Sequence, residues 1–381
     1  MDAHVLLLNW RDTAHPEGGG SEVYVEQVAA ELASHGYRAT MLCAKHTDAA
    51  AQESRGGDIT ILRRGGRHTV YMRAALTYLS GKFGFGPLSR RRLGRPDVIV
   101  DVGNGIPFLS KLYSRKPVLA LVHHVHREQW PVVMGSWWMA KLGWWIESRL
   151  AIRVYRNCRY VTVSAATRRE LTTLGVDAGR ISIVHNGTPE LPIVSTERDT
   201  APTLLVLGRL VPHKRVEIAL RTLARLLPDF PGLRLIVAGS GWWDTHLRDY
   251  ARELGVAEHV EFAGFVSQED KQRLLARAWV VLTPSLKEGW GLTIVEAAAQ
   301  GTPTVAFAAA GGVAEALVDG RTGLLAVDED HFVKLVQELL GDAERREAMG
   351  DAARAHAASF TWQAAGEEFA GLIEGLLAER A

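Results

Sequence analysis

Short apolar runs alternate with longer segments of helical periodicity along the whole chain of 381 residues. In the first half, the apolar runs predict strands at 4–10, 38–44, 97–103, 117–124 and 160–165. Apolar residues at helical spacing (Val25, Val28, Ala29 and Leu32) predict a helix after the first of these strands. The alternation is typical of a parallel sheet covered by helices, so the sequence predicts an α/β fold.

The alternation stops at residues 185–203, a segment rich in Pro, Thr and Ser, and then restarts. Further strands are predicted at 203–209, 233–241, 260–266, 279–285 and 302–308. We therefore predict two doubly wound parallel-sheet domains, at 1–190 and 191–361, that face a central cleft. A final helix at 362–381 packs locally or crosses back to the first domain, and we expect the crossing. Ligands of such sheets bind beyond the carboxyl ends of the strands.

The net charge is close to zero, at +1, but the charged residues are unevenly distributed. Residues 1–195 hold 25 Lys and Arg against 16 Asp and Glu, whereas residues 196–381 hold 19 against 27. The two halves are therefore expected to face different partners. Only two cysteines are present, the first apolar run is too short for a signal peptide, and no run is long enough to span a membrane. These features predict a cytoplasmic protein.

Three consecutive glycines, Gly18–Gly20, precede the first predicted helix. Because glycine has no Cβ, such a loop lets the charged group of a ligand approach the backbone closely. The alternative interpretation is a plain flexible turn. The spacing does not match G-x-G-x-x-G, so no dinucleotide-binding fingerprint is predicted.

The segment 284–307 carries two acidic residues near a predicted helix start. Backbone amides at that start, about Gly291 and Leu292, would form an anion site. Glu288 precedes the helix, and Glu296 lies inside it, roughly 7 Å along the axis. That position suits a group that binds ribose hydroxyls beside a phosphate. The alternative is that both glutamates are ordinary solvated charges.

Two cations follow the first strand of the second half. Arg209 comes at the end of that strand, and Lys214 comes five residues later, in a loop before a helix. Both would lie at the carboxyl end of the strand, where a guanidinium fork and an ammonium suit a diphosphate. Taken alone, each is also compatible with an ordinary surface charge.

Taken together, these residues resemble the retaining glycosyltransferases of family 4. Glu288 and Glu296, with seven residues between them, look like the E-x7-E pattern of that family, and "GRLVPHK" resembles its Gly-Arg…Lys segment. The family's usual order is also matched by "GGGSE", "HNGT" (185–188), "VAGSG" (237–241) and "GGVAEALVDGRTGLL" (311–325). The resemblance covers nearly the whole chain. It implies the GT-B fold, two Rossmann-like domains of which the second holds most of the nucleotide-sugar donor.

The resemblance also implies roles for single residues. Arg209 and Lys214 would grip the diphosphate of the donor and stabilise its charge as it leaves. Glu288 would bind sugar hydroxyls and Glu296 the ribose. No residue is identified as a covalent nucleophile.

Backbone groups have implied roles as well. Gly291 and Leu292 would offer N–H groups to the donor, and the loop at Gly19 and Gly20 would lie over the donor phosphates and the acceptor site. No cofactor is expected, and a metal ion is not expected to be required.

Three histidines, His123, His124 and His126, follow a predicted strand. Many members of the resembled family have a histidine here that lines the sugar site; His123 is the best positional match and His124 the second. The alternative is hydrogen bonding within a loop, and zinc is disfavoured because no acidic partner is nearby. Asp328 and Asp330 form the Asp-x-Asp pattern of metal-dependent glycosyltransferases, but their place before a helix predicts helix capping.

A basic segment and a group of tryptophans bear on the acceptor. Residues 63–95 hold nine Lys and Arg and no acid, and the pairs Trp137/Trp138 and Trp144/Trp145 repeat at seven residues on one helical side. Such features mark an anionic membrane surface or a lipid-linked acceptor. The alternative is a solvated basic loop beside a tryptophan stripe in the core. Nucleic acid is not expected, because no binding motif accompanies the charge.

We therefore predict a retaining hexosyltransferase that moves a sugar from a nucleotide-diphosphate donor to an acceptor hydroxyl, with a cytoplasmic or membrane-peripheral location. The acceptor is a lipid-linked molecule, a glycan or a natural product, and the first domain would bind it. One alternative is a sugar phosphorylase or nucleotide-sugar epimerase of the same fold. A second is a non-catalytic nucleotide-sugar-binding protein.

Overall fold

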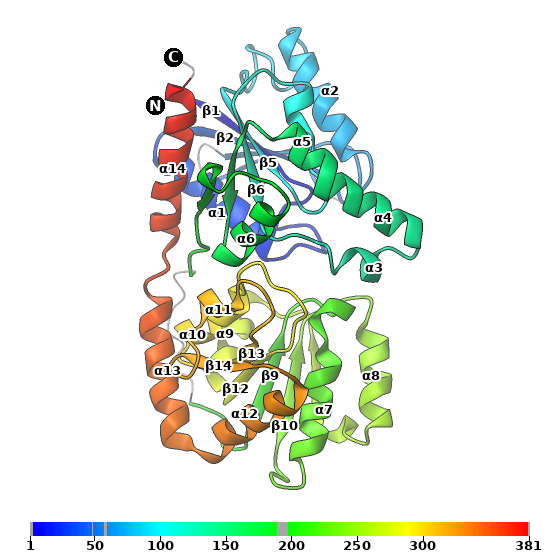
Figure 1. Ribbon diagram of the computed structural model, residues 1–381, viewed down its shortest axis with the longest axis vertical. Coiled ribbons are helices and arrows are strands. Elements are labelled where there is room, and N and C mark those ends of the chain that lie inside the picture. Colours follow the sequence, from blue (N-terminus) through cyan, green and yellow to red (C-terminus); the bar gives the residue numbers. More distant parts are fainter. Residues whose placement is uncertain (1–2, 48, 57–58, 189–196, 380–381) are drawn as a thin grey trace. The chain divides into compact units, whose positions relative to one another are not determined.

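The computed structural model describes residues 3–47, 49–56, 59–188 and 197–379. The chain forms two compact units: unit 1 comprises Met1–Gly187 with Trp362–Ala381, and unit 2 comprises Thr188–Thr361. Each unit is a sheet flanked by helices (Figure 1). Residues 189–196 of the predicted linker lie outside the described residues, and so does the boundary expected at residue 190, which stays a prediction.

Unit 1 contains an eight-stranded sheet in the order β3-β4-β2-β1-β5-β6-β7-β8. Neighbouring strands run parallel except for the edge pair β3–β4, which is antiparallel. Every residue of β1 and β5 is buried, as expected for parallel strands covered on both faces. The strands are β1 (His4–Leu8), β2 (Arg38–Cys43), β3 (Gln52–Arg55), β4 (Ile59–Arg63), β5 (Val98–Val102), β6 (Val118–Val122), β7 (Arg159–Thr162) and β8 (Ile181–Ile183).

The helices of unit 1 cover both faces of its sheet. On one face, α2 (Val70–Lys82), the π-helix η2 (Ile146–Ala151) and α6 (Ala165–Thr173) share an apolar cluster with Leu6 and Leu8 of β1. The C-terminal helix α14 (Trp362–Ala378) belongs to unit 1 and packs against α1 (Gly20–Ser34). The other helical segments are η1 (Ser110–Leu112), α3 (Trp130–Val133), α4 (Trp137–Trp145), α5 (Ile152–Val154) and η3 (Ala178–Arg180).

Unit 2 contains a six-stranded sheet in the order β11-β10-β9-β12-β13-β14, in which each neighbouring pair runs parallel. The first strand of the unit, β9, lies between β10 and β12, so the strand order reverses beside it. Such a reversal is the topological switch point at which α/β sheets bind ligands. The strands are β9 (Thr203–Leu207), β10 (Arg234–Ala238), β11 (Val260–Gly264), β12 (Val280–Thr283), β13 (Thr304–Phe307) and β14 (Gly323–Ala326).

The helices of unit 2 follow its strands in the βα alternation that the sequence predicts. The α/β class is therefore confirmed, whereas β3, β4, β8 and β14 are strands that the apolar pattern did not reveal. The helical segments are η4 (Pro212–Lys214), α7 (Val216–Leu226), α8 (Asp244–Glu253), η5 (Ala257–His259), α9 (Gln268–Arg277), α10 (Leu292–Ala299), α11 (Val313–Ala316), α12 (Glu329–Gly341) and α13 (Ala343–Ala357).

Candidate functional site

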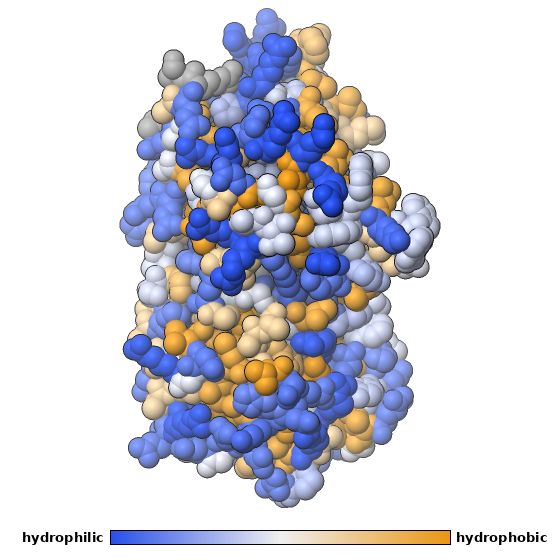
Figure 2. Space-filling model, viewed as in Figure 1, coloured by the Kyte–Doolittle hydropathy of each residue, from blue (hydrophilic) through white to orange (hydrophobic). Residues whose placement is uncertain are grey.

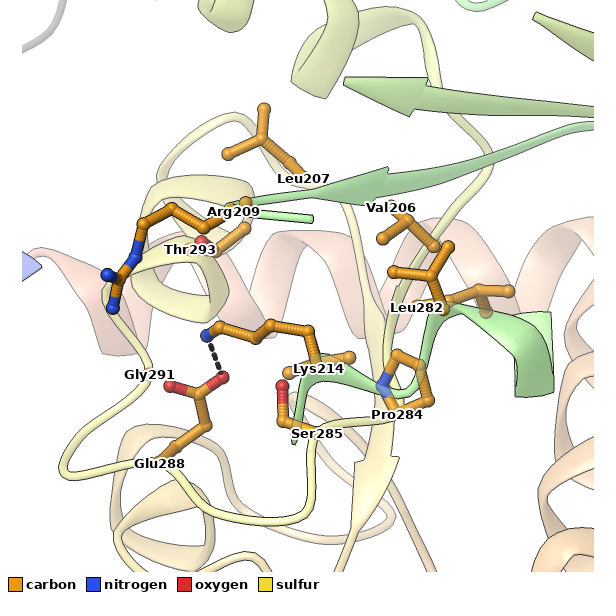
Figure 3. Close-up of a pocket in the computed structure, with 13 residues that line it drawn as sticks. Val206, Leu207, Arg209, Lys214, Leu282, Pro284, Ser285, Glu288, Gly291 and Thr293 are labelled. Carbon is orange, nitrogen blue, oxygen red and sulfur yellow. Dashed lines mark hydrogen bonds and ion pairs between the residues drawn. The ribbon is translucent and has the colours of Figure 1, made fainter. Parts of the chain in front are cut away.

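A pocket of about 380 Å³ lies in unit 2 at the carboxyl ends of β9 and β12. These strands are the neighbours across which the strand order reverses, so the topology itself places a pocket here. Four of the residues singled out in the sequence line it together, namely Arg209, Lys214, Glu288 and Gly291. Figure 3 shows the side chains of Arg209, Lys214 and Glu288 directed to the same side of this pocket.

The loop that carries Lys214 is held by the residue that follows it. Arg215 has a left-handed backbone, with φ 49°, between η4 and α7. Its guanidinium donates hydrogen bonds to the carbonyls of Pro284 (2.8 Å) and Ser285 (3.1 Å) in the loop after β12. Arg215 therefore ties the Lys214 loop to the Glu288 loop. Sequence reasoning missed it, because neither its left-handed conformation nor its carbonyl partners leave a motif.

Lys214 and Glu288 form an ion pair at the pocket, with 2.5 Å between Nζ and Oε1 (Figure 3). Burial acts to raise the pKa of Glu288. The charge of Lys214, with the hydrogen bonds from Lys214 and Ser285, outweighs burial and leaves this pKa below its usual value. The carboxylate is therefore ionised at neutral pH. An anion entering the pocket would compete with it for the ammonium group.

The first turn of α10 borders the same pocket. Gly291 is the N-cap of this helix and has φ 106°, and Gly291 and Thr293 both line the pocket. The positive φ favours glycine here, and a Cβ on Gly291 would also lie 2.8 Å from Cδ1 of Ile294, a side-chain end that would have to shift. Leu292 is the first helical residue, which confirms the predicted helix start. The opening amides of a helix lack intrahelical partners and suit an anion.

Two glycines after β13, Gly311 and Gly312, pack against the backbone of the loop that carries Glu288. Gly312 donates its N–H to the carbonyl of Glu288 (3.0 Å), and Glu288 donates its own N–H to Ala310 (2.9 Å). A Cβ on Gly312 would lie 2.1 Å from the carbonyl oxygen of Gly289. The "GG" at 311–312 is therefore required by close backbone packing that fixes one wall of the pocket.

Replacing Gly312 by alanine is expected to lower the free energy of unfolding of unit 2 by about 1–3 kcal/mol, because the new Cβ forces two backbones apart. Hydrogen exchange of the unit 2 amides, measured at increasing urea concentrations, gives this change in the free energy of unfolding. The matched control is Gly341→Ala, at a position where a Cβ meets nothing within 4 Å. That variant should be neutral or slightly stabilised. Equal stability of the two variants would contradict the packing argument.

Glu296, the second acidic residue of the predicted pattern, lies on α10 but does not line this pocket. It is buried, and its Oε1 is 2.6 Å from Nζ of Lys271 on α9. Burial raises the pKa of Glu296, and the Lys271 charge opposes this without cancelling it. Lys271 had no signal in the sequence. The ribose-binding role of Glu296 stays a prediction.

The three glycines lie in unit 1, at the start of α1. Gly19 is the N-cap, and its N–H donates to the carboxylate of Glu22 at 2.7 Å. None of the three glycines has a left-handed φ. At Gly18 a Cβ would lie 3.0–3.3 Å from three backbone carbonyl oxygens, so local crowding explains this glycine. The role of Gly19 and Gly20 toward a donor phosphate stays a prediction.

The three histidines after β6 differ in their surroundings: His123 is buried, whereas His124 and His126 each lie within hydrogen-bond distance of a side chain. His123 is buried and edge-on to Tyr24, with ring centroids 5.2 Å apart. Burial lowers its pKa to about 3, so the ring is neutral, and its Nε2 is buried with no hydrogen-bond partner among the described residues. His124 lies 3.2 Å from Gln129 in the same loop, whereas His126 lies 2.9 Å from Glu147 of η2, 21 residues away. The expectation that no acidic residue lies near the histidines is therefore wrong.

Unit 1 has a second cavity, of about 450 Å³, beneath η2 and α5. Its lining is mostly apolar and includes the buried carboxylates of Asp101 and Glu147. Glu147 accepts hydrogen bonds from Trp130 and from His126, and Asp101 accepts the amides of Phe108 and Ser110. Both acids are therefore satisfied by local groups that shape this part of the unit.

The Asp-x-Asp pattern of unit 2 caps a helix. Asp328 is the N-cap of α12 and accepts the N–H of His331 at 2.8 Å, which confirms the capping prediction. Asp330 pairs with Arg225 at 2.7 Å. Within the described parts of the chain, no three His, Cys, Asp or Glu residues converge as a metal-binding group.

Comparison with known protein families covers both units. Residues 18–190 match the model described as "Glycosyltransferase Family 4", and residues 188–356 match "Glycosyl transferases group 1". The two matches together span both the histidine segment and the pocket of unit 2.

Similar proteins and structures agree with these matches. The chain is 34% identical over 287 residues to glycogen synthase of Mycobacterium tuberculosis, which covers 72% of this chain and 68% of that protein. Sucrose-phosphate synthase from Thermosynechococcus elongatus has a similar fold, with a TM-score of 0.81, 20% identity, and coverage of 99% and 100%. Anabaena Alr3699/HepE, solved in complex with UDP-glucose, gives a TM-score of 0.73 at 18% identity, with coverage of 98% and 99%.

Proposed function

Because the chain belongs to the family 4 glycosyltransferases of the GT-B fold, we propose that it transfers a hexose-type sugar from a nucleotide-diphosphate donor to an acceptor hydroxyl with retention of anomeric configuration. The bond between the anomeric carbon and the diphosphate oxygen breaks, and a bond from the acceptor oxygen forms on the same face. The acceptor hydroxyl proton is released as the diphosphate departs.

One observation carries the proposal. Arg209, Lys214 and the first turn of α10 border a single pocket at the switch point of unit 2. A guanidinium, an ammonium and helix-start amides together form a cradle for a diphosphate, and they stabilise the negative charge that grows on it during departure. The UDP-glucose bound by the structurally similar Anabaena protein supports a nucleotide sugar as donor.

Glu288 has two roles in this proposal, one before the donor binds and one afterwards. Its carboxylate holds Lys214 in place before the donor arrives, through the 2.5 Å ion pair. When the diphosphate replaces Glu288 as the ion-pair partner of Lys214, the carboxylate of Glu288 becomes free to accept hydrogen bonds from sugar hydroxyls. The ammonium group is thereby positioned in advance, which reduces the reorganisation needed at the moment of reaction.

We assign the acceptor to unit 1, where His123 offers a neutral ring whose buried Nε2 has no hydrogen-bond partner in the part of the chain that the structure describes. A buried nitrogen without a partner is costly, so a hydrogen bond from or to a sugar hydroxyl would relieve it. Its neutral state suits hydrogen bonding to a hydroxyl rather than pairing with a charge.

The proposal is tested by a thermal-shift screen of UDP- and GDP-sugars, followed by turnover with lipid-linked, glycan and small-molecule acceptors. We expect nucleotide release that depends on an acceptor, with a glycoside of unchanged anomeric configuration by NMR. Release that depends on free phosphate would indicate a phosphorylase, and donor binding without release for every acceptor would indicate a binding protein. We also propose that no metal is required, so excess EDTA should leave the rate unchanged.

Replacing Glu296 by glutamine is expected to weaken binding of the donor nucleotide about tenfold, because a charge-assisted hydrogen bond to the ribose is lost. Affinity for inorganic pyrophosphate, which has no ribose, should be unchanged. Isothermal titration of both ligands measures the difference. Lys271→Gln is the control, since it breaks the same ion pair. Glu296→Gln and Lys271→Gln could instead lose stability alike, with neither variant changing the affinity for the nucleotide relative to pyrophosphate. Glu296 would then be only a structural partner of Lys271.

A further inference from the structure

One helix of unit 1 exposes an unusual set of large side chains. Trp137, Trp138 and Trp145 of α4 are 72%, 61% and 51% exposed. Of the four clustered tryptophans only Trp144 packs against the core, so the interpretation of the group as a core stripe is wrong. The exposed large apolar residues of α3 and α4 are Val132, Trp137, Trp138, Met139, Leu142 and Trp145.

A second exposed apolar group lies on α2 and the loop after it. This group is interleaved with cations and comes from the segment without acids. Its exposed apolar residues are Met72, Leu76, Phe83 and Phe85. Its exposed cations are Arg73, Lys82, Arg90, Arg91 and Arg92. Arg63, by contrast, is buried with Asp12 and does not belong to this surface.

The turn η1 joins these two groups. Tyr78 of α2 hydrogen-bonds Ser114, just after η1, at 2.7 Å. On the other side, Ser110 of η1 donates its N–H to the hydroxyl of Tyr155, at the end of α5, at 3.2 Å. Leu112 of η1 is exposed as well. We call the exposed side chains of α2 with residues 83–92, of η1, and of α3–α5 the aromatic-cationic face.

The charge of this face is of one sign. Its α4–α5 part adds the exposed cations Lys141, Arg149, Arg153 and Arg156, and Lys141 lies 3.9 Å from the ring centroid of Trp137. In the sequence of 63–95, 110–116 and 130–156 the one acid is Glu147, which is buried. Figure 2 shows pale and orange side chains beside blue ones around α4 and α2; tryptophan is pale on this scale.

We propose that the aromatic-cationic face binds the surface of an anionic membrane. Tryptophan and phenylalanine favour the headgroup region, leucine and methionine reach the acyl boundary, and Lys and Arg attract anionic headgroups. A two-fold contact of this face with the same face of a second copy is disfavoured, because it would bring cations against cations. No helix in the described ranges is long and apolar enough to cross a membrane.

Resting on the proposed function, this inference specifies the acceptor: unit 1 would meet an acceptor hydroxyl carried by a lipid. Membrane binding itself needs neither donor nor acceptor. A failure of vesicle binding would therefore leave sugar transfer untouched, and a failure of sugar transfer would leave vesicle binding untouched.

The test is flotation of the full chain with vesicles of phosphatidylcholine alone or with 30% phosphatidylglycerol. We expect binding to the anionic vesicles at about 0.1 M salt, weaker binding at about 0.5 M salt, and little binding to the neutral vesicles. Quenching of tryptophan fluorescence by brominated lipid should accompany the binding.

Two variants and their matched controls locate the binding surface. W137S/W138S/W145S should lower the vesicle partition coefficient about tenfold or more, whereas W242S, which removes an exposed tryptophan of unit 2, should not. R90S/R91S/R92S should lower it about fivefold per charge. The control R225S/R252S/R273S removes the same charge from unit 2 and should have little effect.

Three outcomes would overturn the proposal. The first is equal binding to anionic and neutral vesicles. The second is an equal loss of vesicle binding in the face variants and in their controls. The third is that the protein does not bind vesicles but forms a dimer in sedimentation equilibrium, and that W137S/W138S/W145S dissociates this dimer. The last outcome would identify the face as a self-association interface. The unfolding temperature of each variant is measured alongside. The tryptophan variant changes α4, whereas the arginine variant changes the turn segment after α2, so a folding defect in one leaves the other decisive.

Discussion

Replacing Lys214 by alanine is expected to lower kcat for sugar transfer about a hundred- to a thousandfold. The ammonium group lines the pocket at the switch point of unit 2, next to Arg209. In the proposed reaction it stabilises charge that develops as the diphosphate leaves, and the loss of one preorganised group of this kind has effects of that size. Single-turnover rates at saturating donor measure the chemical step directly.

The controls separate this chemistry from stability. Lys214→Ala leaves the carboxylate of Glu288 without its ion-pair partner, which destabilises the fold as well. The double variant Lys214→Ala/Glu288→Gln removes the stranded charge, so it should regain stability but not turnover. Lys334→Ala, at an exposed position on α12, should have normal turnover. Near-normal kinetics in Lys214→Ala would refute the assignment of Lys214 to the leaving group.

The ion pair between Lys214 and Glu288 also predicts how the stability of the fold depends on pH. The pKa of Glu288 is lower in the folded protein than in an unfolded chain, where it is about 4.3. The pair therefore contributes stability above the unfolded pKa, and that contribution is lost as the pH falls through the folded pKa. Acid unfolding of Lys214→Ala should lack this part of the pH dependence below about pH 4.

Much of the fold could be predicted because it depends on patterns that a sequence displays. The strands β1, β2, β5, β6 and β7 are buried apolar runs between helical segments, and they mark a parallel sheet without further information. The strand β3 reads "QESR" and has no apolar run, since it is an antiparallel edge strand with half-exposed side chains. The strand β8 has three residues, too few to show a period.

The candidate site divides in the same way. Arg209, Lys214 and Glu288 could be singled out because they follow strands whose carboxyl ends meet. Arg215 and Lys271 could not, since each acts through a partner far away in the sequence: carbonyls 69 and 70 residues on for Arg215, and a carboxylate 25 residues on for Lys271. Sequence spacing records which residues share a strand end, but not which loops are tied together.

Asp12→Ala is expected to lower the free energy of unfolding of unit 1 by about 1.5–3 kcal/mol, because the buried Arg63 keeps its ion pair with Glu53 but loses its charge-assisted hydrogen bonds to Asp12. Asp12 is fully buried and accepts hydrogen bonds from Arg63, whose side chain is only 1% exposed. His46 and Arg55 lie 3.4 and 3.5 Å from the same carboxylate. Hydrogen exchange of unit 1 amides in urea measures the change.

A double variant tests whether the cost comes from the weakened pairing of the Arg63 charge, which keeps only Glu53 as its acidic partner among the described residues. In Asp12→Ala/Arg63→Met neither ion remains, so the loss of stability should be smaller than in Asp12→Ala alone. Glu17→Ala, which removes the exposed partner of Arg11, should cost about 1 kcal/mol or less. The carbonyl of Asp12 also accepts the N–H of His15 in the loop that crowds Gly18. The substitution keeps this backbone carbonyl but removes the side chain that anchors residue 12 to Arg63. Asp12→Ala should therefore speed amide exchange in the glycine loop first, and uniform exchange across unit 1 would contradict this local role.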